Sequence, residues 1–336
     1  MNTMQVVHLC AMAGLGEPLE EPQAVTGGLL HRVWRLKTST GTFALKQLNA
    51  ALLQRPGVHH AYRLSEKIAG EMAARGIPAV AALAHDAGDV LYELDDMTLL
   101  VYKWVDGAVL STEGVTLEQV RQVGALLARM HALNLRLPEV PPLEWTHFED
   151  EDWDILTFQA SDLNLAWANP VRSVLPRLLE WTRAYEEAGK VLSQHMLVSH
   201  THCDPSNVIW SDPRTPWLID WEAAGLVNPT MELVGTALTW SGLLTGEGDK
   251  ERFTVLLTAY CDAGGTIVSS GQDAINGYMG TMLGWLLFNM RCTLGESVAS
   301  DEEQLIGLRE TTSTLASLRI LATHAPTWAA LLDACH

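Results

Sequence analysis

Apolar residues in the first hundred positions fall in short runs separated by turn residues, which is typical of a sheet. The runs VWRL and TFALKQL flank the turn signal STG, and further short runs follow at 79–83, 90–94 and 98–105. Apolar residues three and four positions apart predict one helix over 61–76, which ends at a glycine and a proline. We therefore expect a five-stranded sheet with one major helix in this part of the chain.

After residue 107 the apolar pattern changes to the spacing of helices. The segment 117–133 repeats apolar residues three and four positions apart, which predicts an amphipathic helix. The stretches VSHTHCDPSNVIW and WLIDWEAAG predict a strand–loop–strand unit among the helices. The fold class is therefore predicted as α+β, with a small antiparallel-sheet lobe over 1–104 and a larger, mainly helical lobe over 105–336. The other helices are expected at 173–194, 231–244, 251–264, 272–293 and 302–325.

Composition and charge limit the classes of partner. The 336 residues are 48% hydrophobic and carry a formal net charge of -18, so the chain can form a sizeable core but lacks the basic surface that nucleic-acid backbones require. Acidity of this size favours cationic ligands, although solubility alone can also explain it. The longest apolar stretch, 277–290, is interrupted by glycines and is shorter than the roughly 20 residues that span a bilayer.

The cysteines and the N-terminus bear on the cellular compartment. Five scattered cysteines, without a CxxC pair, indicate reduced thiols rather than a disulfide framework. The first residues lack the basic region and the long apolar run of a signal peptide. Together with the acidic charge and the short apolar stretches, these features predict a cytoplasmic protein without nucleic-acid or membrane partners.

Two oxygen-bearing side chains predict a magnesium site. Asp220 ends a short apolar strand, and Asn207 lies on the loop before the paired strand. A carboxylate and an amide oxygen are hard ligands of the kind that Mg²⁺ prefers. The alternative for this pair is the ordinary turn and cap chemistry of aspartate and asparagine.

Lys46 lies in a strand with apolar neighbours, so its own side of the strand is expected to face something polar. A lysine there can hold the α- and β-phosphates of a nucleotide if a carboxylate pins it, and Glu66 on the following helix is suitably placed. Gly27 and Gly28 could form a flexible loop over the phosphates. Taken singly, a strand lysine is more often a solvated residue, and two glycines more often mark a plain turn.

The order of these residues along the chain is more specific than any one of them. A glycine turn, a strand lysine, a helix glutamate, His-x6-Asn and a strand-end aspartate form the phosphoryl-transfer layout of kinases. Over about residues 25–325 the chain resembles the aminoglycoside phosphotransferase / choline kinase-like group of small-molecule kinases. The stretches that carry the resemblance are GGLLHRVWRLKTSTGTFALK, GIPAVAAL, LVYKWVDG, GALLARMHAL, SHTHCDPSNVIW and LIDWEAAGLVNPTMEL.

The resemblance implies a two-lobed, protein-kinase-like fold. The lobe 1–104 would bind the nucleotide, and the lobe 105–336 would carry the catalytic loop and the substrate site. ATP or GTP would be the phosphoryl donor and Mg²⁺ the cofactor.

The resemblance also implies roles for single residues. Lys46 and Glu66 would form the ion pair that orients the phosphates. Asn207 and Asp220 would hold the metal and belong to the catalytic site. The segment between the lobes that meets the adenine would include Val101, Tyr102 and Trp104.

The catalytic loop departs from the family pattern at one position. Members read His-x-Asp-x-x-x-x-Asn, whereas this loop reads His200-Thr-His202, so a histidine stands where the family has its catalytic aspartate. Asp204 lies two residues too late, a shift of about 6–7 Å along an extended segment. His202 can accept a proton, since histidine has an unperturbed pKa of about 6.5, but it lacks the negative charge that aligns the acceptor hydroxyl. We therefore expect slow transfer with nucleotide binding retained.

Two other functions are compatible with this loop. One is a pseudokinase that binds nucleotide or drug without efficient transfer, because of His202. The other, less favoured, is a metallo-hydrolase in which His200, His202 and Asp204 hold zinc, since H-x-H-x-D resembles a metal-binding loop. A catalytic zinc needs three protein ligands with further support, and Pro205 follows where another histidine would be expected.

The acidic run FEDEDWD, at 148–154, is the candidate substrate-binding feature. Asp150, Asp152 and Trp153 could bind an amine through charge and cation–π contact, and a solvated charged loop is the alternative. The leading prediction is an ATP- and Mg²⁺-dependent O-phosphotransferase. It would act on a small cationic hydroxyl compound such as an aminoglycoside-type antibiotic.

Overall fold

The computed structural model describes residues 1–25, 30–146, 148–296, 298 and 300–335. Contacts divide the chain into two compact units. The first comprises Met1–Ala108 with Ile209–Ala224, and the second comprises Val109–Val208 with Gly225–His336. A small antiparallel sheet and a mainly helical remainder confirm the predicted α+β fold class.

The first unit is built on a five-stranded antiparallel sheet, which has the predicted number of strands, but its edge strand β1 is absent from the sequence prediction. The strand order is β1-β2-β3-β5-β4. The apolar run at 79–83 is not a strand, because it contributes only a single bridge, from Ala79 to Leu218. The strands are β1 (Gln23–Val25), β2 (Arg32–Thr38), β3 (Gly41–Gln47), β4 (Tyr92–Leu94) and β5 (Met97–Lys103).

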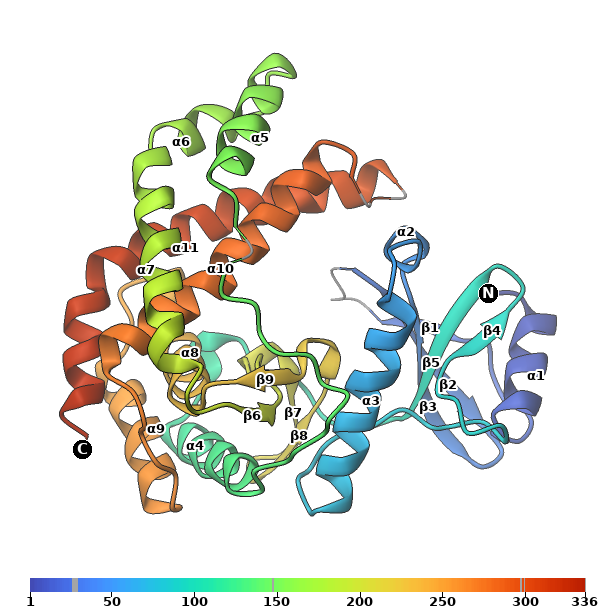
Figure 1. Ribbon diagram of the computed structural model, residues 1–336. Helices are drawn as coiled ribbons and strands as arrows, with labels where there is room; N and C mark the ends of the chain where they lie inside the picture. Colours follow the sequence, from blue (N-terminus) through green and yellow to red (C-terminus); the bar gives the residue numbers. More distant parts are fainter. Residues whose placement is uncertain (26–29, 147, 297, 299, 336) are drawn as a thin grey trace. The chain divides into compact units, whose positions relative to one another are not determined.

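Helix α3 (Val58–Ala74) covers one face of the sheet, as Figure 1 shows. Its Tyr62 packs with Leu48 and Leu100. Lys46 is paired with Leu100 across β3 and β5, and side chains at paired positions share a face. Lys46 therefore points to the side of the sheet that α3 covers, away from the apolar side chains that precede it in its strand.

Helix α1 (Thr3–Met12) covers the other face and is absent from the sequence prediction (Figure 1). It begins at a capping box, in which the backbone N–H groups of Asn2 and Gln5 each donate to the side chain of the other residue. Val6 and Leu9 are buried against the apolar side chains of the sheet. A helix of ten residues has too few apolar repeats for its periodicity to be recognised.

The later stretch Ile209–Ala224 completes the first unit. Backbone hydrogen bonds join Trp210 and Ala108 in both directions, at 3.2 and 2.9 Å. Asp220 therefore lies in the same unit as Lys46, although 174 positions separate them. The elements of this stretch are most of β7 (Val208–Asp212), β8 (Thr215–Leu218) and the one-turn helix η3 (Trp221–Ala223). The short helix α2 (Ala50–Leu53) precedes α3.

An ion pair fastens α3 to the turn before β4. Arg63 donates from Nε to both carboxylate oxygens of Asp89, at 2.9 Å each, and from Nη2 to Oδ2 at 2.7 Å. Hydrogen bonds from the guanidinium lower the pKa of Asp89 to about 2. The pair therefore stabilises the fold at pH values above the ordinary pKa of aspartate, and this stabilisation is lost as the pH falls towards 2.

We expect Asp89→Asn to lower the free energy of unfolding by about 1 kcal/mol at pH 7, since both partners are partly exposed. The difference from the parent protein should shrink below a pH of about 4, because the unfolded parent then binds a proton at Asp89 that the folded parent binds only near pH 2. Urea unfolding from pH 7 to pH 3 measures the effect, with Asp86→Asn at a neighbouring exposed aspartate as the control. A difference that stays constant with pH would contradict the ion-pair explanation.

The second unit is mainly helical, and the helices expected from periodicity are present with shifted ends. They are α4 (Leu117–Ala132), α7 (Leu175–Leu192), α8 (Pro229–Ser241), α9 (Lys250–Asp262), α10 (Gly271–Thr293) and α11 (Asp301–Asp333). The last helix continues past Pro326, which lies inside it. The sequence prediction does not include α5 (Asp150–Asp162) and α6 (Ala168–Arg172). The remaining elements are β6 (Leu197–Ser199), which pairs with β9 (Gly225–Val227), and the one-turn helices η1 (Thr112–Gly114), η2 (Pro205–Asn207) and η4 (Leu243–Thr245).

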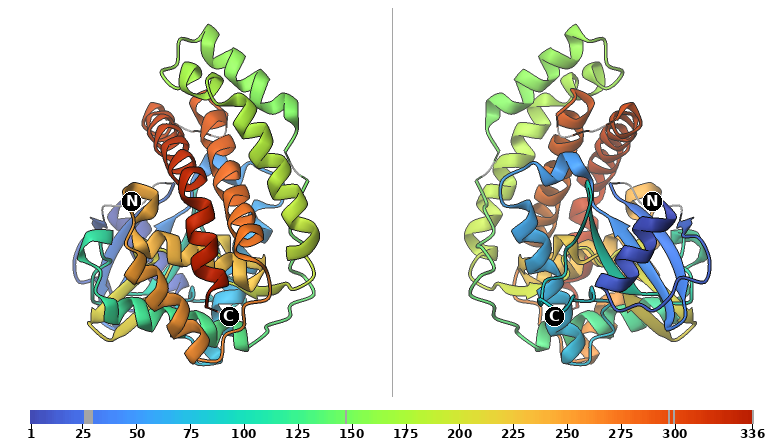
Figure 2. Two further views of the ribbon diagram at one scale, coloured as in Figure 1. Left: turned by 90° about the vertical axis from the view of Figure 1, so that its left-hand side faces the viewer. Right: turned by 90° about the vertical axis from the view of Figure 1, so that its right-hand side faces the viewer.

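Helix α8 forms the centre of the second unit, since nearly all of its residues are buried. Helices α10 and α11 run antiparallel and side by side (Figure 2). Asp333, at the end of α11, accepts from the backbone N–H of Gly271 at the start of α10, and Gln304 donates to the carbonyl of Thr293 at the other end. None of the helices in the described part of the chain has the length and apolar character needed to cross a membrane.

Candidate functional site

Lys46 is the centre of a charged cluster in the first unit. Its Nζ lies 2.8 Å from Oδ1 of Asp220 and 2.5 Å from Oε1 of Glu222. The lysine side chain is 12% exposed, and burial alone would lower its pKa, but the two carboxylates hold the pKa above its ordinary value. Lys46 is thus a fixed and fully charged cation, of the kind that can receive the phosphate oxygens of a nucleotide.

Asp220 occupies a strained turn after β8. Its backbone is left-handed, with φ 62° and ψ 61°, which costs a non-glycine residue on the order of 1–3 kcal/mol. The indole N–H of Trp221 donates to the carbonyl of Leu218 at 3.2 Å and closes the turn. The Asp220 side chain is 44% exposed, so the strain holds a carboxylate in a position where it can bind a cation.

Glu222 and His31 extend the cluster beyond the residues that the sequence predicts. The backbone N–H of Asn49 donates to Nδ1 of His31 at 3.1 Å, so the hydrogen of the neutral ring is on Nε2, which donates to Oε2 of Glu222 at 3.0 Å. The hydroxyl of Tyr62 lies 3.1 Å from the same nitrogen. Burial alone would raise the pKa of Glu222, but Lys46 and His31 lower it to about 2. Glu222 is therefore ionised at neutral pH.

Glu66 makes other contacts than the expected ion pair with Lys46. The hydroxyl of Tyr102 donates to Oε1 of Glu66 at 2.6 Å, and the backbone N–H of Ala82 donates to Oε2 at 2.7 Å. Burial raises the pKa of Glu66 to about 6, although both hydrogen bonds and the charge of Lys46 oppose the shift. In place of an ion pair with Glu66, Lys46 forms ion pairs with Asp220 and Glu222 at the η3 turn.

The residues predicted to meet the adenine lie at the end of β5 and just beyond it. Val101 is fully buried in the core beneath α1, and its carbonyl accepts from the backbone N–H of Leu83 at 2.7 Å. Tyr102 points to the other face of the sheet, where it contacts the α3 carboxylate, and Trp104 is half-buried. Their contact with an adenine stays a prediction. Gly27 and Gly28, the predicted phosphate loop, lie outside the described residues.

The loop after β6 carries the predicted catalytic residues of the second unit. His200 is fully buried, and its Nδ1 accepts from the backbone N–H of His202 at 3.3 Å, so it shapes the loop. Asn207 is also buried, and its Nδ2 donates to the carbonyl of His202 at 2.9 Å. This hydrogen bond sets the orientation of the amide, and Oδ1 is then the side-chain atom that could bind a cation. Asn207 belongs to the second unit and Asp220 to the first, so their joint role as magnesium ligands stays a prediction.

His202, which the sequence analysis assigns to the position of the family aspartate, is paired with Asp204. Nε2 of the histidine lies 3.0 Å from Oδ2 of the aspartate, and the two side chains are 58% and 23% exposed. Burial alone would raise the pKa of Asp204, but His202 and the hydroxyl of Thr239 hold it below its ordinary value. The structure therefore shows Asp204 in contact with His202, and the catalytic role of His202 stays a prediction.

Behind this loop, Glu232 of α8 joins the backbone of Thr201 to His131 of α4. Its Oε1 accepts from the N–H of Thr201 at 2.6 Å, and its Oε2 lies 2.8 Å from Nε2 of His131. The ion-pair partners are almost fully buried. Burial alone would raise the pKa of Glu232, but His131 holds it below its ordinary value. The loop is thus anchored to the centre of the second unit.

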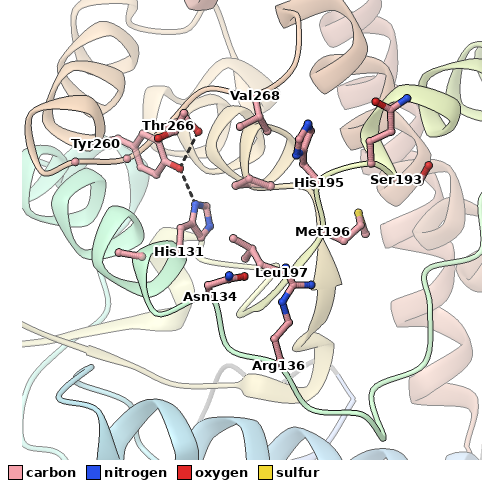
Figure 3. Close-up of a pocket in the computed structure, with 15 residues that line it drawn as sticks. His131, Asn134, Arg136, Ser193, His195, Met196, Leu197, Tyr260, Thr266 and Val268 are labelled. Carbon is pink, nitrogen blue, oxygen red and sulfur yellow. Dashed lines mark hydrogen bonds between the residues drawn. The ribbon is translucent and has the colours of Figure 1, made fainter.

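A pocket of about 520 Å³ adjoins this link in the second unit (Figure 3). Its walls include His131, Arg136, His195 and Tyr260. The hydroxyl of Tyr260 lies 2.8 Å from Nδ1 of His131 and donates to the carbonyl of Thr266 at 3.4 Å. The predicted site residues do not line this pocket, so it gives no support to their roles.

The acidic run 148–154 leads into α5, where carboxylates in the first turn are favoured by the helix dipole whatever their function. Trp153 is fully buried and stacks on Phe148, with 6.2 Å between ring centroids. This burial corrects the interpretation of Trp153 as an amine-binding surface. Asp152 accepts from Nη2 of Arg291 at 3.2 Å, so its charge is balanced within the unit. The side chain of Asp150 lies outside the described residues.

The zinc alternative lacks a suitable cluster of ligands. Among the residues that the structure describes, no group of three or more His, Cys, Asp or Glu side chains is placed to hold a metal ion. His200 is committed to the loop backbone, and His202 to Asp204. Magnesium is a separate case, because it keeps several water ligands and needs only one or two protein oxygens.

Comparison with known proteins places this geometry in a family. A sequence profile described as the phosphotransferase enzyme family matches residues 21–266, which is more than half of the chain. Among curated proteins, no sequence is similar enough to match this chain.

Solved structures share the fold over nearly the whole chain. Spectinomycin phosphotransferase, in complex with ADP and spectinomycin, has a TM-score of 0.71 at 11% identity, covering 97% of this chain and 99% of that one. Ethanolamine kinase from Plasmodium vivax has a TM-score of 0.61 at 14% identity, covering 93% and 87%. Choline kinase from Streptococcus pneumoniae has a TM-score of 0.62 at 16% identity, covering 95% and 99%.

At these identities the structural likeness establishes the fold, which is the predicted kinase-like one. The family match has more weight, because it is a match of sequence that extends through the lysine strand, the catalytic loop and the strand-end aspartate. It confirms the predicted resemblance and the prediction of a phosphotransferase. The chain belongs to the phosphotransferase enzyme family.

Proposed function

We propose that this protein transfers the γ-phosphoryl group of ATP to a hydroxyl group of a small cationic compound, with Mg²⁺ as its cofactor. The observation that carries the proposal is Lys46, held as a buried cation between two carboxylates. Phosphoryl transfer depends mainly on positioning and on stabilisation of charge, and the ammonium group of Lys46 supplies a positive charge in a fixed position. GTP is the alternative donor.

The candidate metal ligands suit magnesium. Asp220 offers a partly exposed carboxylate, and Asn207 offers an amide oxygen whose orientation is set by the hydrogen bond to the loop. Mg²⁺ prefers such oxygen ligands and completes its shell with water and phosphate oxygens. When bound, it would neutralise negative charge on the group that is transferred.

Charge supports a cationic acceptor. The net charge of -18 raises the local concentration of cations around the protein. Three proteins of similar fold are named for spectinomycin, ethanolamine and choline. We infer an acceptor with an amine or ammonium group beside the reacting hydroxyl, and an aminoglycoside-type antibiotic is one such compound.

A pseudokinase is the second candidate, because a histidine occupies the position of the family aspartate. Such a protein would bind ATP through the Lys46 cluster and transfer little phosphate. Turnover separates the two candidates.

The proposal is tested by melting the protein with ATP and Mg²⁺, and by measuring phosphate transfer. The probe acceptors are choline, ethanolamine, spectinomycin and a panel of aminoglycosides, with water as the baseline acceptor. We expect ATP with Mg²⁺ to raise the melting temperature and at least one probe to be phosphorylated. Binding without any transfer would favour the pseudokinase, and no effect of ATP would contradict both candidates.

Removal of the metal should abolish transfer. We expect EDTA to stop the reaction and excess Mg²⁺ to restore it. Asp220→Asn, which keeps the shape of the side chain but removes its charge, should lower kcat about 10²-fold, as for loss of one group that stabilises charge. Asp212→Asn, on the exposed end of β7, is the control. Equal Mg²⁺ dependence in Asp220→Asn and the parent would contradict the assignment of Asp220 as a ligand.

A further inference from the structure

The pair of His202 and Asp204 is the part of the catalytic loop that the family pattern does not explain. The imidazole is more than half exposed, whereas the carboxylate that supports it is largely covered. A hydrogen bond of 3.0 Å joins Nε2 to Oδ2. An exposed base backed by a buried carboxylate is the arrangement by which other enzymes orient a catalytic histidine.

The protonation of the ring follows from this contact. Because a carboxylate only accepts hydrogen bonds, the hydrogen of the neutral ring is on Nε2, and Nδ1 carries the basic lone pair. The carboxylate can therefore balance the positive charge of the ring after Nδ1 takes up a proton.

The backbone beneath the pair is held at several points. Glu232 accepts from the N–H of Thr201, and the indole of Trp240 donates to the carbonyl of Cys203 at 2.8 Å. Asn207 donates to the carbonyl of His202, and Nδ1 of His200 accepts from the backbone N–H of His202. A loop fixed on both sides of the histidine places the ring with little freedom, which is what a positioned base requires.

We propose that His202 and Asp204 act as a catalytic dyad that does the work of the single family aspartate. His202 removes the proton of the acceptor hydroxyl, and Asp204 orients the ring and balances its charge. The proposal rests on the proposed function. It differs from the expectation of slow transfer, because Asp204 restores the negative charge that the histidine lacks.

The chemical step balances as follows. The hydroxyl oxygen of the acceptor forms a bond to the γ-phosphorus of ATP, and the bond from that phosphorus to the leaving oxygen of ADP breaks. The hydroxyl proton moves to Nδ1 of His202, and the ring becomes an imidazolium paired with Asp204. The proton then leaves to solvent, so that ATP and alcohol yield ADP, phosphate ester and one proton.

Four variants test the dyad by kinetics: His202→Ala, Asp204→Asn, their combination, and His324→Ala on the exposed side of α11 as the control. We expect each single dyad variant to lower kcat about 10²-fold, within the usual range for general-base help. The double variant should be no slower than the slower single variant, since the two residues act as one unit. KM for ATP should be unchanged, and the control should match the parent.

Repeating Asp204→Asn in a protein that already carries His202→Asp separates positioning of the imidazole from a general structural effect. In His202→Asp the introduced carboxylate can align the acceptor hydroxyl without a contribution from Asp204. Adding Asp204→Asn should then change kcat by less than about threefold, because the residue acts through the histidine. A similar loss in both backgrounds would mean that Asp204 is structural, and would overturn the proposal.

Proton NMR supplies a readout that does not depend on transfer. We expect a downfield imidazole N–H resonance in the parent, absent from His202→Ala and moved upfield in Asp204→Asn, because a neutral acceptor holds the hydrogen less strongly. Absence of the resonance from the parent would overturn the pair itself.

Failure of the dyad differs from failure of the proposed function. If ATP does not bind, the proposed function fails. If the parent binds ATP but transfers phosphate neither to the probes nor to water, while His202→Asp transfers it, the dyad is overturned and the protein is a disabled kinase. If the parent transfers phosphate and Asp204→Asn is equally fast, the dyad is overturned and the function stands.

Discussion

Lys46→Met should lower kcat about 10³-fold, the upper end of what loss of one fixed charge-stabilising group costs. The lysine is the cation of its cluster and is held by Asp220 and Glu222 at short distances. Methionine has similar length and fills similar volume, so the loss reports charge rather than packing. Steady-state kinetics with the best probe acceptor measures kcat, and calorimetry measures ATP affinity, which should also fall.

The same substitution leaves the η3 carboxylates without their cation, so a loss of folding must be separated from a loss of chemistry. Glu222→Gln added to Lys46→Met removes one of the remaining charges and should recover part of the lost stability without recovering transfer. Lys37→Met, at an exposed position of β2 in the same sheet, controls for loss of a strand lysine. Transfer at the parent rate by folded Lys46→Met would refute the role of the cluster.

The parts of the fold that follow from local periodicity could be predicted. Helices α4 and α7 to α11 of the second unit and strands β2 to β5 of the first have enough apolar positions to be recognised. Alternation in β3 correctly placed Lys46 on the face away from Phe43 and Leu45. Helix α1 and the orientation of Trp153 could not be predicted in this way. The first is too short, and a tryptophan among acidic residues has the same local pattern whether its ring is buried or exposed.

The candidate site could be predicted as an ordered set of residue types, but not as a set of contacts. The order pointed to Lys46, Asn207, His202 and Asp220. The contacts of His31 with Glu222, and of His131 with Glu232, join positions 191 and 101 apart, and no spacing rule relates such positions. Glu222 stands two residues after Asp220, and only the left-handed turn at the aspartate directs both carboxylates to Lys46.

His131→Leu should lower the free energy of unfolding by about 3 kcal/mol, because a buried carboxylate loses one of its hydrogen-bond partners. Glu232 would keep its charge without its hydrogen bond to His131, and the N–H of Thr201 and the side chain of Ser199 would remain beside it. Urea unfolding measures the loss. His195→Ala, an exposed histidine in the wall of the same pocket, should remain near the parent value.

Replacing both partners separates the stability of the pair from its action on the loop. In His131→Leu/Glu232→Leu the buried carboxylate is removed together with its partner, so most of the lost stability should return, as for other buried polar pairs replaced by apolar residues. Transfer should stay low, because the N–H of Thr201 has lost its acceptor and the backbone beside His202 its anchor. Recovery of both stability and kcat in the double variant would contradict this role. It would mean that Glu232 does not position the catalytic loop, and that the other contacts of the loop are sufficient.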